Sequence, residues 1–487
     1  MTGPWPTLLV RPDDAPGVGA GHVMRTLALV ERWAATGPVV VALDEPTSPL
    51  ADRVRAAGAQ VAASAPTAEA AGLGPMLLAH RPAWVVLDGY GFGPDVQGSV
   101  RAAGTRLAVV DDHGHQGRYD ADVVLDQNLG VPPGALKERP DDAAALIGPR
   151  YALIREEFAA AATAEVEQQD AASGDAGAAL PSVVVTLGGY AADRAEALAD
   201  AVAEGLRPLG VTAAVTTPAR AGATTAMAGL LAPATVVVSA AGTTAWELCA
   251  LHRPSVLVAV AGNQEPVGTA LGDAGAARYL GVLDDVGTDA VVAAVAELLT
   301  DADARVRLAV HAAALVDGRG AERVVTELRS SLVSLRPVGP DDRRLVWEWA
   351  NDPAVRDAAW DRRPISWEDH CRWWEGEGAA TRHHYLAEHA GRPWGQVRFD
   401  VDARGVAEVD VSVAEHCRGH RAAAPLIRAG VRRLFADTDA GTVRSSIRLV
   451  NRRSVAAFLA ADFTPWPSAI TGDGHVLTYV RGRDGRH

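Results

Sequence analysis

Over residues 1–165, short apolar runs alternate with stretches in which apolar residues recur every three or four positions. A short continuous apolar run is typical of a strand buried on both faces, and the longer period is typical of a helix. We therefore expect helices such as Pro49–Ala57, and strands at Leu8–Val10, Val39–Leu43, Trp84–Leu87, Leu107–Val110 and Val123–Leu125. This alternation predicts a parallel sheet covered by helices on both faces.

A second region of the same kind follows over residues 180–332. The segment before it, Ala159–Ala179, is rich in Ala, Glu, Gln, Gly and Asp and is predicted to be an interdomain linker or a frayed helix. Beyond it we expect a helix over Asp317–Leu332 that closes the region, and strands at Ser182–Leu187, Val236–Ser239 and Val256–Val260. The two regions together predict two Rossmann-like halves.

The pattern changes near Val333, and most of the tryptophans lie beyond this point. Polar and apolar residues alternate over three runs, which predicts an antiparallel meander at Tyr385–Glu388, Pro393–Asp400 and Ala407–Val413. A helix over 422–435, a strand over 443–449 and a helix over 451–463 are expected to follow. Residues 333–487 are therefore predicted to form a third, separate α/β domain.

Composition and charge narrow the picture. The 487 residues suffice for about three domains, and the net charge of -14 argues against non-specific nucleic-acid binding. The three cysteines (Cys249, Cys371 and Cys417) have the spacing of neither a disulfide framework nor a zinc site. No signal peptide pattern and no run of about 18 apolar residues is visible. We expect a cytoplasmic protein without a membrane anchor or a metal.

A glycine-rich loop follows the first predicted strand. Gly17, Gly19 and Gly21 allow close backbone approach to a ligand, and the helix that starts at His22 offers an anion site at its N-terminus. Arg25 lies one helical turn further on. A helix-start histidine with a satisfied hydrogen bond is the alternative reading of His22.

Polar side chains also follow the later strands. Tyr90 can both stack on and hydrogen-bond a sugar, whereas the acidic residues have turn and cap chemistry as an alternative; these strand-end residues are Asp88, Asp111, Asp112, His113, Asp126, Gln127 and Asn128. In the second region, small residues and hydroxyls open a helix after Ser239, and Glu247 lies one turn into it. For the small residues the alternative is tight packing of the helix on the strand, and for Glu247 it is a solvated helix face. The candidate residues of this region are Gly189, Ser239, Gly242, Thr243, Thr244, Glu247, Asn263 and Gln264.

These motifs resemble the UDP-2,4-diacetamido-2,4,6-trideoxy-β-L-altropyranose hydrolase of pseudaminic acid biosynthesis, a relative of the MurG-type glycosyltransferases. The resemblance rests on the motifs G-x-G-H-x-x-R at Gly19–Arg25 and S-x-x-G-T-x-x-x-E at Ser239–Glu247, with N-Q at Asn263–Gln264. The resemblance implies a GT-B fold, with halves at 1–165 and 180–332, and His22 as the catalytic base. The implied UDP-sugar ligands are Gly19, Gly21, Arg25, Tyr90, Gly189, Ser239, Gly242, Thr243, Thr244, Glu247, Asn263 and Gln264.

The third domain resembles the GNAT acetyltransferases. The phrase W-x-N-D-P-x-V-R, Trp349–Arg356, is similar to the sugar-amine members, one of which acetylates the 4-amino group in the step before the hydrolase. The resemblance implies acetyl-CoA as co-substrate, held by Arg418, Gly419, Arg421, Ala423, Asn451 and Ser454. Arg421 stands where the family has a glycine, and Phe458 stands where it has a tyrosine. A degenerate domain without acetylating activity therefore stays an alternative.

The sequence thus predicts hydrolysis of a UDP-2,4-diacetamido-2,4,6-trideoxyhexose, with a fused domain for 4-N-acetylation of its precursor. In that domain Glu408 or Asp410 could relay a proton, or could be an exposed strand carboxylate. A MurG-like glycosyltransferase with a degenerate GNAT domain is the alternative function. A non-catalytic nucleotide-sugar sensor is a further one.

Overall fold

The computed structural model describes residues 5–483 except 16–19, 65–72, 133, 172–179, 189–190, 222–225, 377–380 and 467–475, and it places no side chains over 165–171 and 476–479. The described chain divides into two compact units. The first, hereafter the N-terminal unit, is Pro6–Ala321. The second, hereafter the C-terminal unit, contains Trp5 together with the chain from Glu322 onward.

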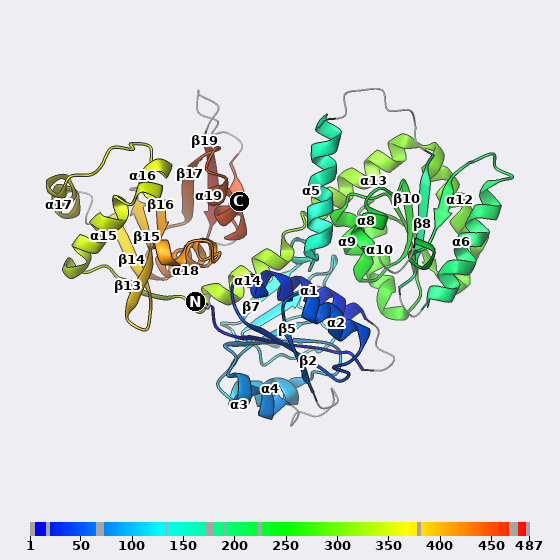
Figure 1. Ribbon diagram of the computed structural model, residues 1–487, viewed down its shortest axis with the longest axis horizontal. Helices are drawn as coiled ribbons and strands as arrows, with labels where there is room; N and C mark the ends of the chain where they lie inside the picture. The colour runs from blue at the N-terminus through cyan, green and yellow to red at the C-terminus, as the bar shows by residue number, and fades with distance from the viewer. Residues whose placement is uncertain are drawn as a thin grey trace. The chain divides into compact units, whose positions relative to one another are not determined.

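The N-terminal unit begins with a seven-stranded sheet in which all pairings are parallel. Its order is β3 (Gln60–Ala63), β2 (Val39–Leu43), β1 (Leu8–Pro12), β4 (Trp84–Asp88), β5 (Arg106–Val110), β6 (Val123–Asp126) and β7 (Ala144–Ile147). Figure 1 shows α1 (Gly21–Ala34) and α2 (Pro49–Ala56) on one face, and α3 (Gly74–His80) and α4 (Pro94–Ala102) on the other. The five predicted strands and the doubly covered parallel sheet are confirmed.

A five-stranded parallel sheet forms the second half of this unit. Its order is β12 (Arg278–Val282), β11 (Ser255–Ala259), β10 (Val236–Ala240), β8 (Ser182–Thr186) and β9 (Ala214–Thr216). Alternate residues of the strands face two separate hydrophobic cores. One core contains α6 (Ala192–Leu206) and α12 (Thr288–Thr300). The other contains residues of α8 (Met227–Leu231), α9 (Thr243–Ala250), α10 (Glu265–Asp273) and α13 (Ala302–Leu315).

Two segments lie between and after the sheets. The segment predicted to be a linker or a frayed helix is a helix as far as it is described, α5 (Glu156–Ala171), which packs on α8 and α9. The predicted closing helix exists as α14 (Gly320–Ser330), and the division between the two units falls inside it, at Glu322. The buried Glu327 on this helix accepts from Arg428 and Arg432 in the C-terminal unit.

The C-terminal unit contains a mixed sheet. Its order is β13 (Ser334–Pro337), β14 (Arg382–His389), β15 (Arg392–Val401), β16 (Val406–Val413), β17 (Thr442–Arg448), β19 (Val476–Gly482) and β18 (Thr464–Pro465). The predicted antiparallel meander is confirmed in β14–β16, whereas β16 and β17 run parallel. The helices are α15 (Arg343–Ala350), α16 (Pro353–Ala358), α17 (Trp367–Glu375), α18 (Ala423–Asp437) and α19 (Arg452–Ala460). Over the described part of the chain, no helix combines the length and the apolar character that crossing a bilayer requires.

Candidate active sites

His22, near the start of α1, is held by a carboxylate at the end of strand β4. The Nδ1 atom of His22 lies 2.7 Å from Oδ1 of Asp88, and both residues are buried. An ionised carboxylate can only accept a hydrogen bond, so in the neutral imidazole the proton lies on Nδ1 and the lone pair on Nε2. Strand β1 lies beside β4, which brings the helix that follows β1 to the end of β4. The structure therefore pairs the predicted base with a group that fixes its tautomer.

Arg25 joins Asp88 to a second carboxylate, Asp112. Its Nε and Nη2 donate to Asp88 at 2.7 and 2.6 Å, and its Nη1 donates to Asp112 at 2.9 Å. Burial alone would lower the pKa of Arg25, but the charges of Asp112 and Asp88 raise it well above its usual value. Burial likewise opposes ionisation of Asp88 and Asp112, and the Arg25 charge nevertheless holds the pKa of both below its usual range. All three groups are therefore charged at neutral pH.

Tyr90 links this cluster to the second half of the N-terminal unit. Its hydroxyl donates to Oδ2 of Asp112 at 3.2 Å and accepts from Nδ2 of Asn263 at 3.1 Å. The Tyr90 ring meets His22 edge to face, with 5.3 Å between the ring centroids. Burial, followed by the Asp112 charge, raises the pKa of Tyr90 to about 12, so the phenol stays protonated. Predicted residues from both halves thus lie together.

The starts of α1 and α9 also lie close together. A Cβ atom on Gly21 would be 3.5 Å from Oγ1 of Thr243, and one on Gly242 would be 3.5 Å from Nε2 of Gln264. The first turn of each helix has backbone N–H groups without helical partners and carries partial positive charge. Thr243 and Thr244 are partly exposed at the start of α9. The arrangement brings two helix N-termini, suited to a diphosphate, beside His22.

Two predicted residues have other partners. Ser239 is fully buried, and its hydroxyl donates to the Ala240 carbonyl at 3.1 Å. Glu247 is also buried and accepts from Nε and Nη2 of Arg155 at 3.0 and 2.8 Å, which connects α9 to the chain just before α5. Burial raises the pKa of Glu247 to about 7, despite the Arg155 charge. These contacts support a structural role for both side chains.

Asn128 extends the cluster to the next strand end. Its Nδ2 donates to Asp112 at 2.8 Å and to Oδ1 of Asp126 at 2.9 Å. Asp126 is fully buried, and its Oδ2 has no hydrogen-bond partner among the described residues. Burial raises the pKa of Asp126 to about 6.

The roles of Asp88, Asp112 and Asn128 as one connected network were not foreseen, although each was noted as a strand-end residue. The available signal was their position after parallel strands, whose carboxyl ends share one edge of the sheet. Predicted residues Gly19 and Gly189 lie outside the described residues, as does Gly17.

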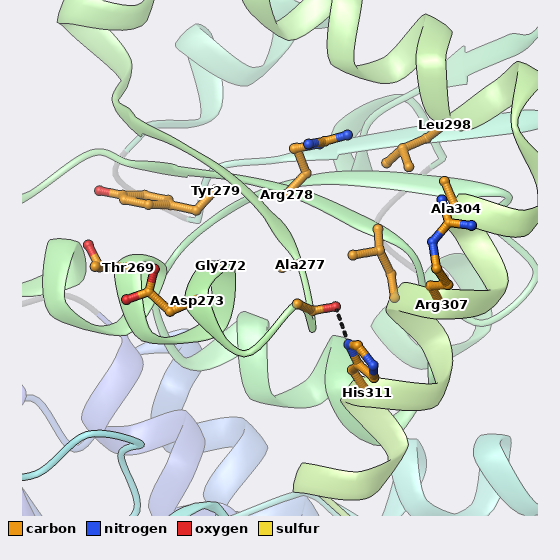
Figure 2. A pocket seen from close by; sticks show the side chains of 12 residues that line it. Thr269, Gly272, Asp273, Ala277, Arg278, Tyr279, Leu298, Ala304, Arg307 and His311 are labelled. Carbon is orange, nitrogen blue, oxygen red and sulfur yellow. Dashed lines mark hydrogen bonds between the residues drawn. The ribbon is translucent and has the colours of Figure 1, made fainter.

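A cavity of about 490 Å³ lies elsewhere in the second half, beside α10, β12 and α13 (Figure 2). Asp273, Arg278, Tyr279, Arg307 and His311 are among the residues that line it, and none of the predicted site residues does. The Nδ1 of His311 lies 3.2 Å from the Gly275 carbonyl, the contact drawn in Figure 2.

In the C-terminal unit, the predicted cofactor loop lies between β16 and α18. Gly419 and Arg421 both have left-handed backbone, with φ of 82° and 53°. Arg421 therefore has a backbone conformation that favours glycine. Its side chain is exposed. Arg418 fixes the loop by donating to the Val413 carbonyl at 3.0 Å and pairing with Asp352 at 2.9 Å. Ala423 is the first residue of α18.

The remaining predicted cofactor residues form a helix cap. The side chain of Asn451 accepts from the backbone N–H of Ser454 at 3.2 Å, at the start of α19. Phe458 is buried and packs edge to face on Phe463, with 5.0 Å between the centroids. The position where a tyrosine was expected is thus part of the hydrophobic core.

Strands β16 and β17 pair only at their beginnings. The pairing runs from Val406 with Thr442 to Glu408 with Arg444, while β16 continues to Val413. Among the described residues no strand pairs with this side of β16 beyond Glu408, and a free strand edge can pair with the amides of an extended ligand. Of the two proposed proton relays, Glu408 accepts from Arg444 at 2.6 Å and Asp410 pairs with Arg398 at 3.1 Å. Both carboxylates are therefore neutralised by arginines.

Comparison with known families assigns this part of the chain. Residues 333–464 match the family described as the acetyltransferase (GNAT) domain. This segment is a GNAT acetyltransferase domain. The match covers less than half of the chain and therefore leaves the N-terminal unit unassigned. No curated protein matches the sequence.

Solved structures similar to the chain include GNAT enzymes. One is the aminoglycoside acetyltransferase AAC(6')-Ib in complex with paromomycin and acetyl-CoA, at 22% identity and a TM-score of 0.29, covering 31% of this chain and 94% of that one. Another is the spermidine N-acetyltransferase from Vibrio cholerae in complex with CoA and spermine, at 16% identity and a TM-score of 0.29, covering 32% of this chain and 98% of that one.

Proposed function

We propose that the N-terminal unit is a GT-B hydrolase that releases UDP from UDP-2,4-diacetamido-2,4,6-trideoxy-β-L-altropyranose or a stereoisomer. The observation that carries the proposal is the His22–Asp88 pair, which lies beside the start of α9 and is linked through Tyr90 to Asn263. A base with a fixed tautomer and an anion-binding helix start are the two groups that hydrolysis of a sugar diphosphate needs.

In the proposed reaction, Nε2 of His22 takes a proton from a water molecule whose oxygen attacks the anomeric carbon. The bond between that carbon and the phosphate oxygen breaks, and UDP leaves as the diphosphate anion. Backbone amides of Gly242 and Thr243, with the α9 dipole and the Thr244 hydroxyl, stabilise the charge on UDP. Asp88 holds the imidazole in the reactive tautomer and stabilises the imidazolium that forms. Attack opposite the leaving group inverts the anomeric centre.

The test is incubation of the full-length protein with the UDP-sugar in water, without any acceptor. The hydrolase predicts release of UDP together with a reducing sugar. A MurG-like glycosyltransferase would release UDP only when an acceptor is present. A sensor would bind the UDP-sugar and return it unchanged.

For the C-terminal unit we propose acetyl transfer from acetyl-CoA to the 4-amino group of the precursor UDP-sugar. The neutral amine attacks the thioester carbonyl carbon, the carbon–sulfur bond breaks, and the leaving CoA thiolate takes up the proton that the nitrogen loses. The loop at Arg418–Ala423 supports a site for the CoA pyrophosphate, because it leads into the N-terminus of a 15-residue helix. The edge of β16 beyond Glu408 supports a site for the pantetheine amides.

Mass spectrometry of products from the 4-amino UDP-sugar plus acetyl-CoA tests this second activity. The proposal predicts an acetylated UDP-sugar intermediate and then the free diacetylated sugar. If the 4-amino compound is recovered without acetylation, the GNAT domain of this chain is degenerate.

A further inference from the structure

Among the described residues, the C-terminal unit contains one from the opposite end of the sequence, Trp5. Trp5 is only 5% exposed, and its contacts place it with the residues from Glu322 onward rather than with the strand β1 that follows it. Its ring meets Trp394 on β15 edge to face, with 6.4 Å between the centroids. The guanidinium carbon of Arg329 on α14 lies over the same ring, 4.9 Å from its centroid. The indole is therefore fixed by two elements of this unit.

The polar atom of this indole reaches the predicted cofactor loop. Nε1 of Trp5 donates to the backbone carbonyl of His420 at 2.9 Å. An indole N–H can only donate, and a buried one needs an acceptor, so this contact fixes the direction of the carbonyl.

The orientation of the His420 carbonyl also fixes the orientation of the next N–H group. The His420 carbonyl and the Arg421 N–H belong to the same peptide group, which is planar and trans. In a trans peptide the C=O and N–H point in opposite directions. Holding the carbonyl toward Trp5 therefore points the Arg421 N–H away from Trp5. Among the described residues this N–H has no backbone acceptor.

We propose that Trp5 is a positioning residue for nucleotide binding by the GNAT domain, because it orients the His420–Arg421 peptide so that its N–H faces the CoA pyrophosphate. The proposal rests on the proposed acetyl-CoA site at this loop. It adds a residue that lies far outside the GNAT domain in sequence. Trp5 does not contact the cofactor itself, and it acts through the loop.

The inference predicts a loss that is specific to the pyrophosphate. In full-length Trp5→Phe the aromatic contacts remain while the N–H donor is lost, so the dissociation constant of CoA should rise about three- to tenfold, the effect of one hydrogen bond. The dissociation constant of 3'-dephospho-CoA, which keeps the pyrophosphate, should rise by the same factor. S-acetylpantetheine, which lacks the pyrophosphate, should keep its wild-type KM as acetyl donor. The rate constant kcat with saturating acetyl-CoA should also be unchanged.

Trp33→Phe is the matched control, because Trp33 is a buried tryptophan of the N-terminal unit whose Nε1 donates to the Pro6 carbonyl at 3.1 Å. This variant should leave CoA affinity at the wild-type value. Thermal unfolding of both variants checks that each is folded at the temperature of the measurements. Trp5→Tyr, which keeps an aromatic ring, repeats the test if Trp5→Phe does not fold.

The outcomes separate this inference from the proposed function. If wild-type protein binds no CoA, the proposed acetyl-CoA site is wrong. If wild-type protein binds CoA and the Trp5 variants bind it equally well, only the role of Trp5 is wrong. A rise in the KM of S-acetylpantetheine by the same factor would also overturn the inference, because Trp5 would then act on the fold of the domain as a whole.

Discussion

At the scale of single residues, Asp88 holds two side chains at once, since it accepts from Nδ1 of His22 and from two nitrogens of Arg25. The sequence predicted His22, Arg25 and Tyr90, because the glycine loop and the strand ends mark these positions. It could not predict that Asp88 would be the common partner of His22 and Arg25, because β1 and β4 are neighbours in the sheet but are separated in sequence by β2 and β3. Glu247 shows the opposite limit, since its motif position suggested a ligand contact while the fold pairs it with Arg155.

For His22→Ala we expect turnover to fall about 10²–10⁴-fold while UDP affinity stays at the wild-type value, because a general base is lost and the diphosphate site is kept. Asp88→Asn should also slow turnover, since an amide can hold the wrong tautomer. The measurement is UDP release under saturating UDP-sugar, with calorimetry for UDP binding. His311→Ala, at the distant cavity, is the control. Wild-type turnover in His22→Ala would leave His22 with a structural role only.

Asp126 predicts a pH dependence of stability. Its pKa of about 6 in the folded state lies above the unfolded value near 3.9, so its contribution to stability is present below about pH 4 and is lost as the pH rises through about 6. Asp126→Asn removes this loss, so the variant should gain about 1–3 kcal/mol relative to wild type at pH 8 and much less at pH 4. Urea unfolding at the two pH values measures the difference. An equal effect at both would show that Asp126 does not titrate in this range.

At the scale of elements, burial decides which strands could be predicted. The central strands β1, β2, β4, β8, β10 and β11 are almost wholly buried, and each was visible as an apolar run. The edge strands β3, β7, β9 and β12 are largely half-exposed. None of them was predicted, although β7 is a short apolar run. The cofactor loop was found from its motif, but the left-handed backbone of Arg421 required the structure.

For Arg421→Gly we expect a gain in stability of up to about 1 kcal/mol, because a left-handed conformation costs a residue with a side chain more than it costs glycine. CoA should also bind more tightly, since the arginine side chain no longer crowds the loop. Calorimetric titration with CoA and thermal unfolding measure the two effects. Weaker CoA binding would mean that the Arg421 side chain contacts the phosphates directly.

At the scale of the whole molecule, the change of pattern near Val333 predicted a separate C-terminal domain. The pattern of α14 shows an amphipathic helix without showing which unit its apolar face covers. Its residues from Glu322 onward lie with the C-terminal unit, where Glu327 pairs with Arg428 and Arg432 and Arg329 lies over the ring of Trp5. Long-range charge pairs of this kind have no signature in local sequence.

A fragment of residues 333–487 lacks both Glu327 and Trp5, so Arg428 loses its buried ion pair with Glu327 and keeps the one with Asp462. Breaking a buried ion pair costs about 3–5 kcal/mol. We expect this fragment to unfold at a clearly lower temperature than a fragment of residues 320–487, which keeps α14. Thermal unfolding of the two fragments measures the difference. Equal melting temperatures would show that α14 contributes little to this unit.

The central claim is that the His22–Asp88 pair directs water to the anomeric carbon of a UDP-sugar. The most direct measurement is mass spectrometry of UDP released by the full-length protein in ¹⁸O-labelled water, without an acceptor and with His22→Ala in parallel. We expect wild-type protein to release UDP free of ¹⁸O, because the carbon–oxygen bond breaks, and His22→Ala to release it far more slowly. UDP that carries ¹⁸O would place the attack at phosphorus, and no release of UDP without an acceptor would contradict hydrolysis altogether.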